Sequence, residues 1–245
     1  MSEPPRPVGL PLRLRPPVAR LAVTGLVIAV GLTLLLTIGV NRPAAESDEA
    51  ASAHAGSLPA PNAAAPPRGV PAPVDRPHAS DEAELAAWAK EVGGLTGIPV
   101  RAVRAYGLAE MWMRTDAPKC RLAWSTLAGI GEVASKHAGG KVEPNGELSE
   151  PVVAGDGRVG PLHITPAKWK AHRFRAARDR ERPDPQHIDD AAVTAARVLC
   201  AQGNDLTGAR AWWKAVAAFG GSTKFAQRVY LATERYAKAS AAAGR

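Results

Sequence analysis

The stretch GIGEVASKHA, residues 129–138, is the part of this 245-residue chain on which the fold assignment depends. Ala123, Leu127, Ile130 and Ala134 recur at helical steps and predict a buried helix over residues 122–137. The helix contains one carboxylate, Glu132, and two residues later the side chain is only the methyl group of Ala134. The stretch therefore belongs either to a helix that carries chemistry or to one that only holds a core together.

Helical patterns continue on both sides of this stretch. Asp81 and Glu84 have the spacing of a capping box, which marks the start of a helix. The expected helices begin at residue 81 and then cover residues 99–118, 122–137, 189–203, 212–219 and 223–239. Strand-type alternation is nearly absent, and the Gly- and Pro-rich residues 139–157 are expected to form a loop. The sequence predicts a mainly α domain of about six helices over residues 81–245.

An uncharged apolar segment, residues 21–40, precedes this domain. Twenty helical residues span a hydrocarbon core of roughly 30 Å. The four arginines before residue 21 predict a cytoplasmic tail over residues 1–20 and an exported remainder. The segment is longer than the apolar part of a cleaved signal peptide, and the nearest A-x-A pattern begins at Ala51. We expect an uncleaved signal-anchor and a single-pass protein of the cell membrane, with its C-terminal domain extracytoplasmic.

Residues 41–80 have the composition of a spacer. Half of these forty residues are Ala or Pro and none is aromatic. Such a segment buries too little apolar surface to offset the entropy lost on ordering. We therefore expect a disordered Ala/Pro linker that holds the domain away from the membrane.

The formal charge of +8 favours an acidic partner surface, such as a membrane or an anionic wall polymer. No basic run is interleaved with aromatic residues, so we expect no nucleic-acid partner. Asp179 and Glu181 dilute the densest basic cluster, which we expect to be a solvated face or loop. That cluster consists of Arg173, Arg175, Arg178, Arg180 and Arg182.

The two cysteines, Cys120 and Cys200, fit an exported domain. A pair in an oxidising compartment is expected to form a disulfide, and the alternative is two buried free thiols. His163, His172 and His187 lack metal-ligand spacing and no cysteine pair accompanies them, so no metal is expected. Phosphate-binding and nucleophile-elbow motifs are also absent from the sequence, and we expect no cofactor.

Four separated motifs, in this order, resemble the lytic murein transglycosylases of the membrane-bound B type, in the exported form common in actinobacteria. They are the helix over residues 122–137, GPLHITPAKW at 160–169, DPQHIDDAAVTAARVLCAQGNDL at 184–206 and WWKAVAAFGGS at 212–222. The resemblance covers about residues 98–237. It implies a lysozyme-like, mainly helical fold, and it matches Cys120 and Cys200 to the family's disulfide.

The resemblance also implies a reaction. The family cleaves the glycan between N-acetylmuramic acid and N-acetylglucosamine and leaves a 1,6-anhydro end. A single glutamic acid protonates the leaving oxygen and then acts as base toward the sugar's own 6-hydroxyl. No second carboxylate and no cofactor are needed.

The family segment resembles G-I-G-x-x-E-S-x-H-G, which places the catalytic glutamate at Ala134. Alanine transfers no proton, and a general acid–base group commonly contributes a factor of about 10²–10⁴ in rate. Glu132 is a weak substitute, because two helical residues rotate by about 200° and turn it away from Ala134. We expect Glu132 to be an exposed helix glutamate. Other acids that a loop might supply are Glu143, Glu147, Glu150 and Asp156.

The remaining polar positions of the family pattern have also changed. His163 stands where the family has a glutamine expected to face substrate, and Phe219-Gly220 replaces a Tyr-Asn pair. His163, Trp169 and Phe219 are the candidate substrate contacts, and each also fits a core or solvated position. Loss of polar cleft residues with retention of the scaffold is expected for a catalytically inactive descendant, a pseudoenzyme.

Three functions remain open from the sequence. The first is an anchored cell-wall protein, catalytically degenerate, that binds peptidoglycan glycan strands or a wall-synthesis or division protein. The second is an active lytic transglycosylase that takes its acid from elsewhere. The third is a protein-interaction scaffold without glycan contact.

Overall fold

The computed structural model describes residues 58–73, 82–202 and 205–242, which belong to one compact unit over Leu58–Arg245. Over these residues the prediction of a mainly α domain is confirmed, since the described part contains seven α-helices and no strands beyond isolated β-bridges. The predicted cytoplasmic tail and membrane anchor, residues 1–40, lie outside the described residues. Within the described part, no helix is both long and apolar enough to cross a bilayer.

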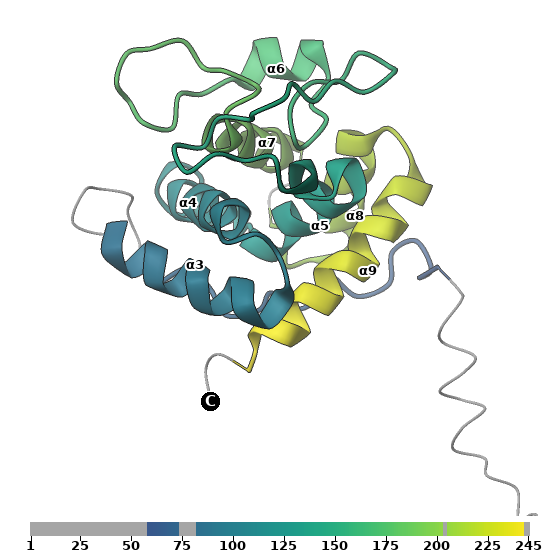
Figure 1. Ribbon diagram of the computed structural model, residues 1–245. Helices are drawn as coiled ribbons and strands as arrows, with labels where there is room; N and C mark the ends of the chain where they lie inside the picture. Colours follow the sequence, from purple (N-terminus) through teal and green to yellow (C-terminus); the bar gives the residue numbers. More distant parts are fainter. Residues whose placement is uncertain (1–57, 74–81, 203–204, 243–245) are drawn as a thin grey trace, which may run out of the picture. The chain divides into compact units, whose positions relative to one another are not determined.

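Figure 1 shows the order of the helices, which matches the prediction except for one addition and small shifts at the ends. They are α3 (Glu82–Thr96), α4 (Val100–Asp116), α5 (Trp124–Ser135), α6 (Pro166–His172), α7 (Ile188–Gln202), α8 (Ala209–Gly220) and α9 (Thr223–Ser240). Short 3₁₀ turns cover Pro118–Cys120 (η2) and His137–Gly140 (η3). The addition is α6, where the Thr165 hydroxyl caps the backbone N–H of Lys168 and Pro166 occupies the first turn.

Helix α5 is the centre of the core. Each of its residues from Trp124 to Gly131 is buried, and α4, α7 and α9 pack around it. A Cβ at Gly129 would lie 2.3 Å from the Thr233 hydroxyl oxygen of α9, and one at Gly131 would lie 2.2 Å from the Tyr106 hydroxyl oxygen of α4. The two glycines therefore permit separations between helices that no other residue allows.

The prediction that residues 41–80 are disordered is wrong for residues 58–73, and the rest of that range lies outside the described residues. Residues 58–73, here called the strap, lie along the domain. A proline-rich backbone makes no internal hydrogen bonds, so its carbonyl oxygens are free to accept them. Five domain side chains, from four different helices, donate to these carbonyls at 2.8–2.9 Å: Arg114, Trp124, Ser125, Trp213 and Gln227. The composition of residues 58–73 does not predict this order, because the order comes from hydrogen-bond donors on α4, α5, α8 and α9.

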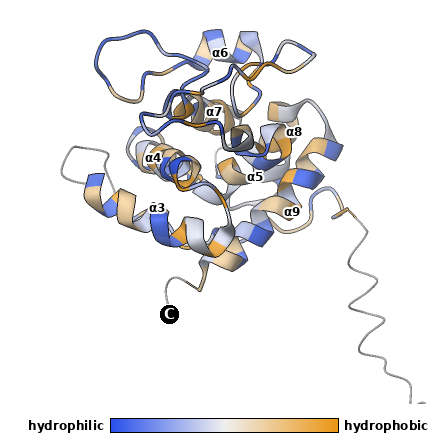
Figure 2. Cartoon of the chain, viewed as in Figure 1, coloured by the Kyte–Doolittle hydropathy of each residue, from blue (hydrophilic) through white to orange (hydrophobic). Residues whose placement is uncertain are grey.

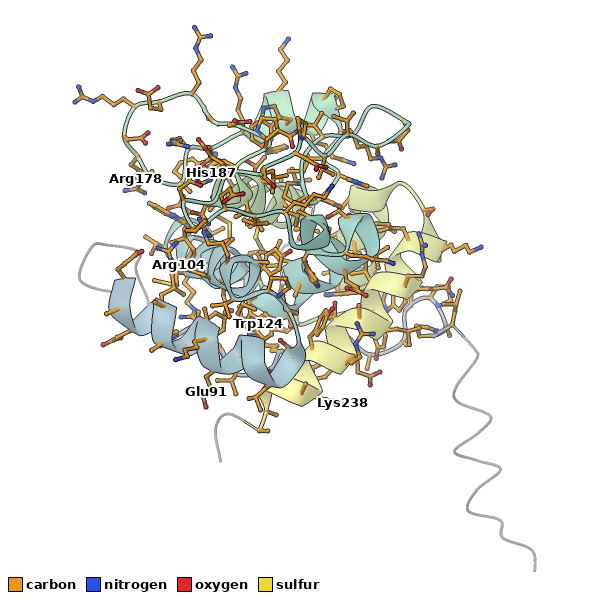
Figure 3. All side chains as sticks on the ribbon, in the orientation of Figure 1. Glu91, Arg104, Trp124, Arg178, His187 and Lys238 are labelled. Atoms are coloured by element: carbon orange, nitrogen blue, oxygen red, sulfur yellow. A yellow bond between two sulfur atoms is a disulfide. The ribbon has the colours of Figure 1, made fainter. Side chains whose placement is uncertain are left out.

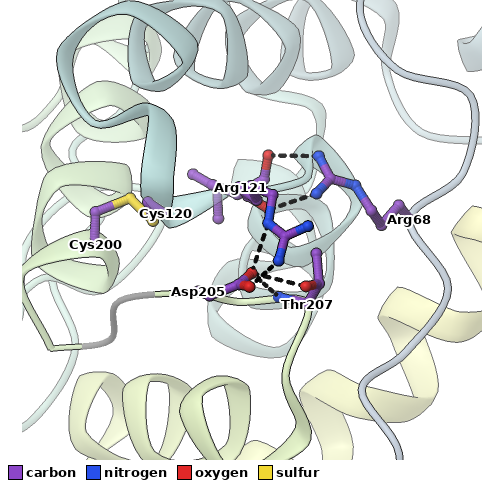
Figure 4. Close-up of a disulfide and its surroundings, with 7 residues drawn as sticks. Arg68, Cys120, Arg121, Cys200, Asp205 and Thr207 are labelled. Carbon is purple, nitrogen blue, oxygen red and sulfur yellow. Dashed lines mark hydrogen bonds and ion pairs between the residues drawn. A yellow bond between two sulfur atoms is a disulfide. The ribbon is translucent and has the colours of Figure 1, made fainter.

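A disulfide joins η2 to α7 next to the strap (Figure 4). The predicted pair, Cys120 and Cys200, is confirmed with an S–S distance of 2.06 Å. The next residue, Arg121, forms an ion pair with Asp205, and the Arg121 carbonyl oxygen accepts a 2.7 Å hydrogen bond from Arg68 of the strap. Disulfide, ion pair and strap thus stabilise the same segment of chain, immediately before α5 begins.

The close approach at Gly129 predicts a strong effect of a single methyl group. Gly129→Ala is expected to lower the free energy of unfolding by about 2–3 kcal/mol, because the new Cβ would overlap Thr233 and the Val229 carbonyl oxygen. Urea denaturation of the two proteins measures this difference.

The matched control is Gly94→Ala in α3, where a Cβ meets no atom within 4 Å. Alanine is the better helix former, so this variant is expected to be more stable than the natural protein by about 0.5 kcal/mol. Equal effects of the two substitutions would show that the contact at Gly129 does not limit the approach of α9.

Candidate functional site

Three of the four sequence motifs converge at the C-terminal end of α5. The Ser135 hydroxyl, next to Ala134, donates a 2.7 Å hydrogen bond to the carbonyl oxygen of Pro161. Farther along that second motif, the Lys168 ammonium group donates to the carbonyl oxygens of Ala218 and Phe219 at 2.7 and 2.9 Å. The end of α5, residues 160–169 and the end of α8 are thus linked, and we call this region the candidate site.

At the centre of the candidate site, Ala134 is half-buried and offers no proton. Of the four loop acids considered as replacements, Glu143 and Glu147 are exposed, and the other two have cationic partners. Glu150 forms an ion pair with Lys141, and Asp156 forms one with Arg158 at 2.9 Å. Arg158 also reaches the candidate site, because its guanidinium donates to the Gly220 carbonyl oxygen at 3.1 Å. Asp156 is therefore linked to the candidate site through Arg158, and its carboxylate is paired with that arginine.

Two cationic side chains bind the C-terminal end of α8. Lys168 and Arg158 together bind the last carbonyl oxygens of α8, the negative end of that helix. Burial and the nearby Arg158 charge lower the pKa of the Lys168 ammonium group. Neither Lys168 nor Arg158 is a candidate site residue by its sequence position, because each makes its contact with a segment at least 50 positions away. The candidate site therefore combines the methyl group of Ala134, at the end of α5, with two cationic side chains bound to the end of α8.

The structure places the three predicted contacts in different environments. His163 is half-buried with φ of +49°, and burial lowers the pKa of its imidazole. Trp169 is half-buried in α6 and packs against the core. The Phe219 side chain is only 2% exposed, so its ring belongs to the core and presents no surface to a ligand. Of the three, His163 and Trp169 remain as accessible candidates.

Glu132 is not the free surface glutamate that its sequence position predicts. Its carboxylate accepts a 3.0 Å hydrogen bond from the Tyr236 hydroxyl of α9, and its side chain is 35% exposed. The Tyr236 hydroxyl oxygen also lies 3.0 Å from Nε2 of His137, and Nδ1 of His137 lies 3.1 Å from the Tyr106 hydroxyl. These four side chains form one network, here called the buried network because all of them except the partly exposed Glu132 are buried, and it joins α4, the end of α5 and α9.

The hydrogen bonds of this network are consistent with one set of directions and one tautomer of His137. Tyr236 donates to Glu132, so it accepts from Nε2–H of His137, and Nδ1 of His137 accepts from Tyr106. Burial is the main cause that lowers the pKa of His137 to about 4, with the charge of Arg235 acting in the same direction against that of Glu132. His137 is therefore neutral at pH 7, and its 3.3 Å approach to Glu132 is not an ion pair there. Burial raises the pKa of Tyr236 to about 12.

A left-handed turn follows α5 immediately. Five consecutive residues, from Lys136 to Gly140, have φ between +52° and +80°. Residues other than glycine pay roughly 1–2 kcal/mol each for this conformation, and the first three here are not glycine. Hydrogen bonds hold the turn: the Ser135 hydroxyl accepts from the backbone N–H of Ala138, and His137 belongs to the buried network. The left-handed turn over residues 136–140 thus fixes the path of the chain immediately after α5, close to Ala134.

Among the described residues, no three His, Cys, Asp or Glu side chains lie close enough together to bind a metal ion. Comparisons with protein-family models, with curated proteins and with solved structures gave no match.

The low pKa of His137 predicts a pH dependence of stability. Between pH 6.5 and 4 the unfolded chain binds a proton at this residue that the folded chain does not, so stability falls as the pH is lowered. The free energy of unfolding is expected to drop by about 2 kcal/mol from pH 7 to pH 5 on account of His137 alone. Denaturation of the natural protein and of His137→Asn at both pH values isolates this contribution. An equal drop in the variant would contradict it.

The left-handed turn predicts a stabilising substitution. Lys136 is exposed at the C-cap of α5 with φ of +52°, a position that favours glycine. Lys136→Gly is expected to raise the free energy of unfolding by about 1 kcal/mol. Lys136→Ala removes the same side chain but keeps the backbone penalty, so it is expected to give no gain. Indistinguishable unfolding curves for the two variants would argue against the left-handed conformation at this residue.

Proposed function

We propose that this chain is a membrane-anchored, exported protein of the cell wall whose lysozyme-like, lytic-transglycosylase-like domain binds peptidoglycan without cleaving it. The observation that supports this proposal is the convergence of three family-like motifs on the end of α5, where Ala134 occupies the position of the acid. The proposed site retains its backbone framework and has lost the proton donor.

Binding a glycan and cleaving it require different groups from the proposed site. Cleavage by this route requires one group that first donates and then accepts a proton at the glycosidic oxygen and the 6-hydroxyl. Glu132 is committed to Tyr236, which argues against its acting as the substitute acid. A glycan strand needs only shape, hydrogen bonds and apolar contact, for which His163 and Trp169 are the proposed residues.

The membrane anchor over residues 21–40 remains part of the proposal, with the N-terminus cytoplasmic and the domain outside. The disulfide agrees with an oxidising compartment. Export therefore has one supporting observation from the sequence and another from the domain.

A second candidate function rests on Asp156. Arg158 brings this carboxylate to the end of α8, so an active transglycosylase would have Asp156 as its acid. This alternative requires the Arg158 ion pair to open when the glycan binds. An Asp156→Asn variant distinguishes it, because only an enzyme that uses Asp156 loses activity by this change.

The central prediction concerns Ala134. The natural protein is expected to co-sediment with purified peptidoglycan and to release no 1,6-anhydro products detectable by mass spectrometry. Ala134→Glu restores the proton donor, and it is expected to raise product release above that of the natural protein, in line with the factor of about 10²–10⁴ for such a group.

The control is Ala134→Gln, which has the same size as glutamate but transfers no proton. It is expected to bind and to remain inactive. Product release by the natural protein would overturn the inactive assignment, and its loss in Asp156→Asn would identify the acid. Failure of the natural protein to bind peptidoglycan would overturn the proposed function and favour the interaction scaffold.

A further inference from the structure

Half of the chain's formal charge lies in one short region. Residues 166–187 contain seven Lys and Arg residues and three Asp and Glu residues, a formal charge of +4 out of +8. Half of this charge, +2 from five arginines and three acids, belongs to residues 173–187, here called the basic loop. The basic loop connects α6 to α7 and projects above α7 in Figure 1. Figure 2 shows much of this loop as hydrophilic.

The basic loop is built around one buried carboxylate. Asp190 of α7 is fully buried, and its two oxygens accept hydrogen bonds from the backbone N–H groups of Ala176 and Asp184 at 2.9 and 3.0 Å. The two ends of the segment between them are thereby held together, as in a compact Ω-loop. The guanidinium of Arg175 completes the arrangement at 3.2 Å from Asp190.

Two of the five arginines hold the loop in place, although Arg178 is itself exposed. Arg175 binds Asp190 and Asp179, so its charge is compensated. The Arg178 guanidinium carbon lies 3.7 Å from the ring centroid of Trp112 in α4, and this cation–π contact fixes the loop to the core. Figure 3 shows Arg178 at the inner side of the loop.

The other three arginines face solvent. Arg173, Arg180 and Arg182 are exposed, and within the described residues no carboxylate pairs with them. Arg180 has φ of +71°, a conformation that costs energy for any residue but glycine. Asp179 and Glu181 lie between them, and Asp179 is bound to Arg175. Five arginines against three acids leave the anchored loop with a formal charge of +2. Its charge lies on guanidinium groups, which bind phosphate oxygens in pairs.

We propose that the basic loop is a docking site for a linear polymer that carries phosphodiester groups, contacted by Arg173, Arg180 and Arg182. The loop is held in shape before any ligand arrives, so little ordering entropy opposes binding. A lipid surface is the less suitable partner, because none of the exposed large apolar side chains of the described residues belongs to the basic loop. This inference is independent of the proposed function, since the side chains of the three arginines make no hydrogen bond or ion pair with the described residues of the candidate site.

The test uses the full chain, solubilised in a neutral detergent, with inorganic polyphosphate as the probe. The variant replaces Arg173, Arg180 and Arg182 by glutamine. It is expected to bind polyphosphate at least about tenfold more weakly at low salt. The slope of log affinity against log salt concentration is expected to decrease in magnitude by about three, one for each lost phosphate contact.

The matched control replaces Lys214, Lys224 and Arg228 by glutamine. These residues are exposed on α8 and α9, and the net charge changes by the same amount. The control is expected to retain the affinity and the salt slope of the natural protein. Equal losses in the two variants would overturn the proposal in favour of attraction by net charge.

A second arm measures binding to vesicles of phosphatidylglycerol and phosphatidylcholine after removal of residues 1–40. Binding to these vesicles that depends on the three arginines, without binding to polyphosphate, would overturn the proposal in favour of a membrane surface. Unchanged thermal unfolding of the variants confirms that the substitutions act on binding and not on folding.

Discussion

The structure depends on how closely α4 and α9 approach α5. At Gly129 and Gly131 the absence of a side chain lets Thr233 and Tyr106 reach the α5 backbone. This approach brings Tyr106 and Tyr236 within hydrogen-bond distance of His137, which closes the buried network at the end of the helix. The position of Ala134 against residues 160–169 is set by these contacts, because a helix held on two sides has little freedom at its end.

This arrangement explains how the proposed site retains its framework without an acid. The network that holds the end of α5 uses Glu132, His137 and the two tyrosines, and Ala134 takes no part in it. A carboxylate at a half-buried position carries a desolvation cost that a methyl group avoids. An alanine at such a position therefore destabilises the folded state less than a carboxylate does. This agrees with the usual trade-off between activity and stability.

The helices could be predicted from the sequence because their apolar residues repeat locally, and the disulfide because the chain has only two cysteines. Helix α6 is too short for such a repeat, although Thr165 and Pro166 mark its beginning. The contacts of His137 with Tyr236 and of Arg158 with Gly220 join residues 99 and 62 positions apart. No local pattern indicates such a pair, since it arises only when helices distant in the sequence pack together.

If residues 21–40 form the proposed membrane anchor, the docked strap shortens the tether between that anchor and the domain. Its first residue, Leu58, belongs to the compact unit, and Gln227 of α9 holds the neighbouring Pro59 carbonyl oxygen. With an anchor ending at residue 40, only 17 residues lie between bilayer and domain instead of forty. A fully extended chain covers at most about 3.6 Å per residue, so the tether is limited to about 60 Å rather than about 145 Å. Under the proposed anchoring, any ligand of the domain would have to lie within this distance of the bilayer.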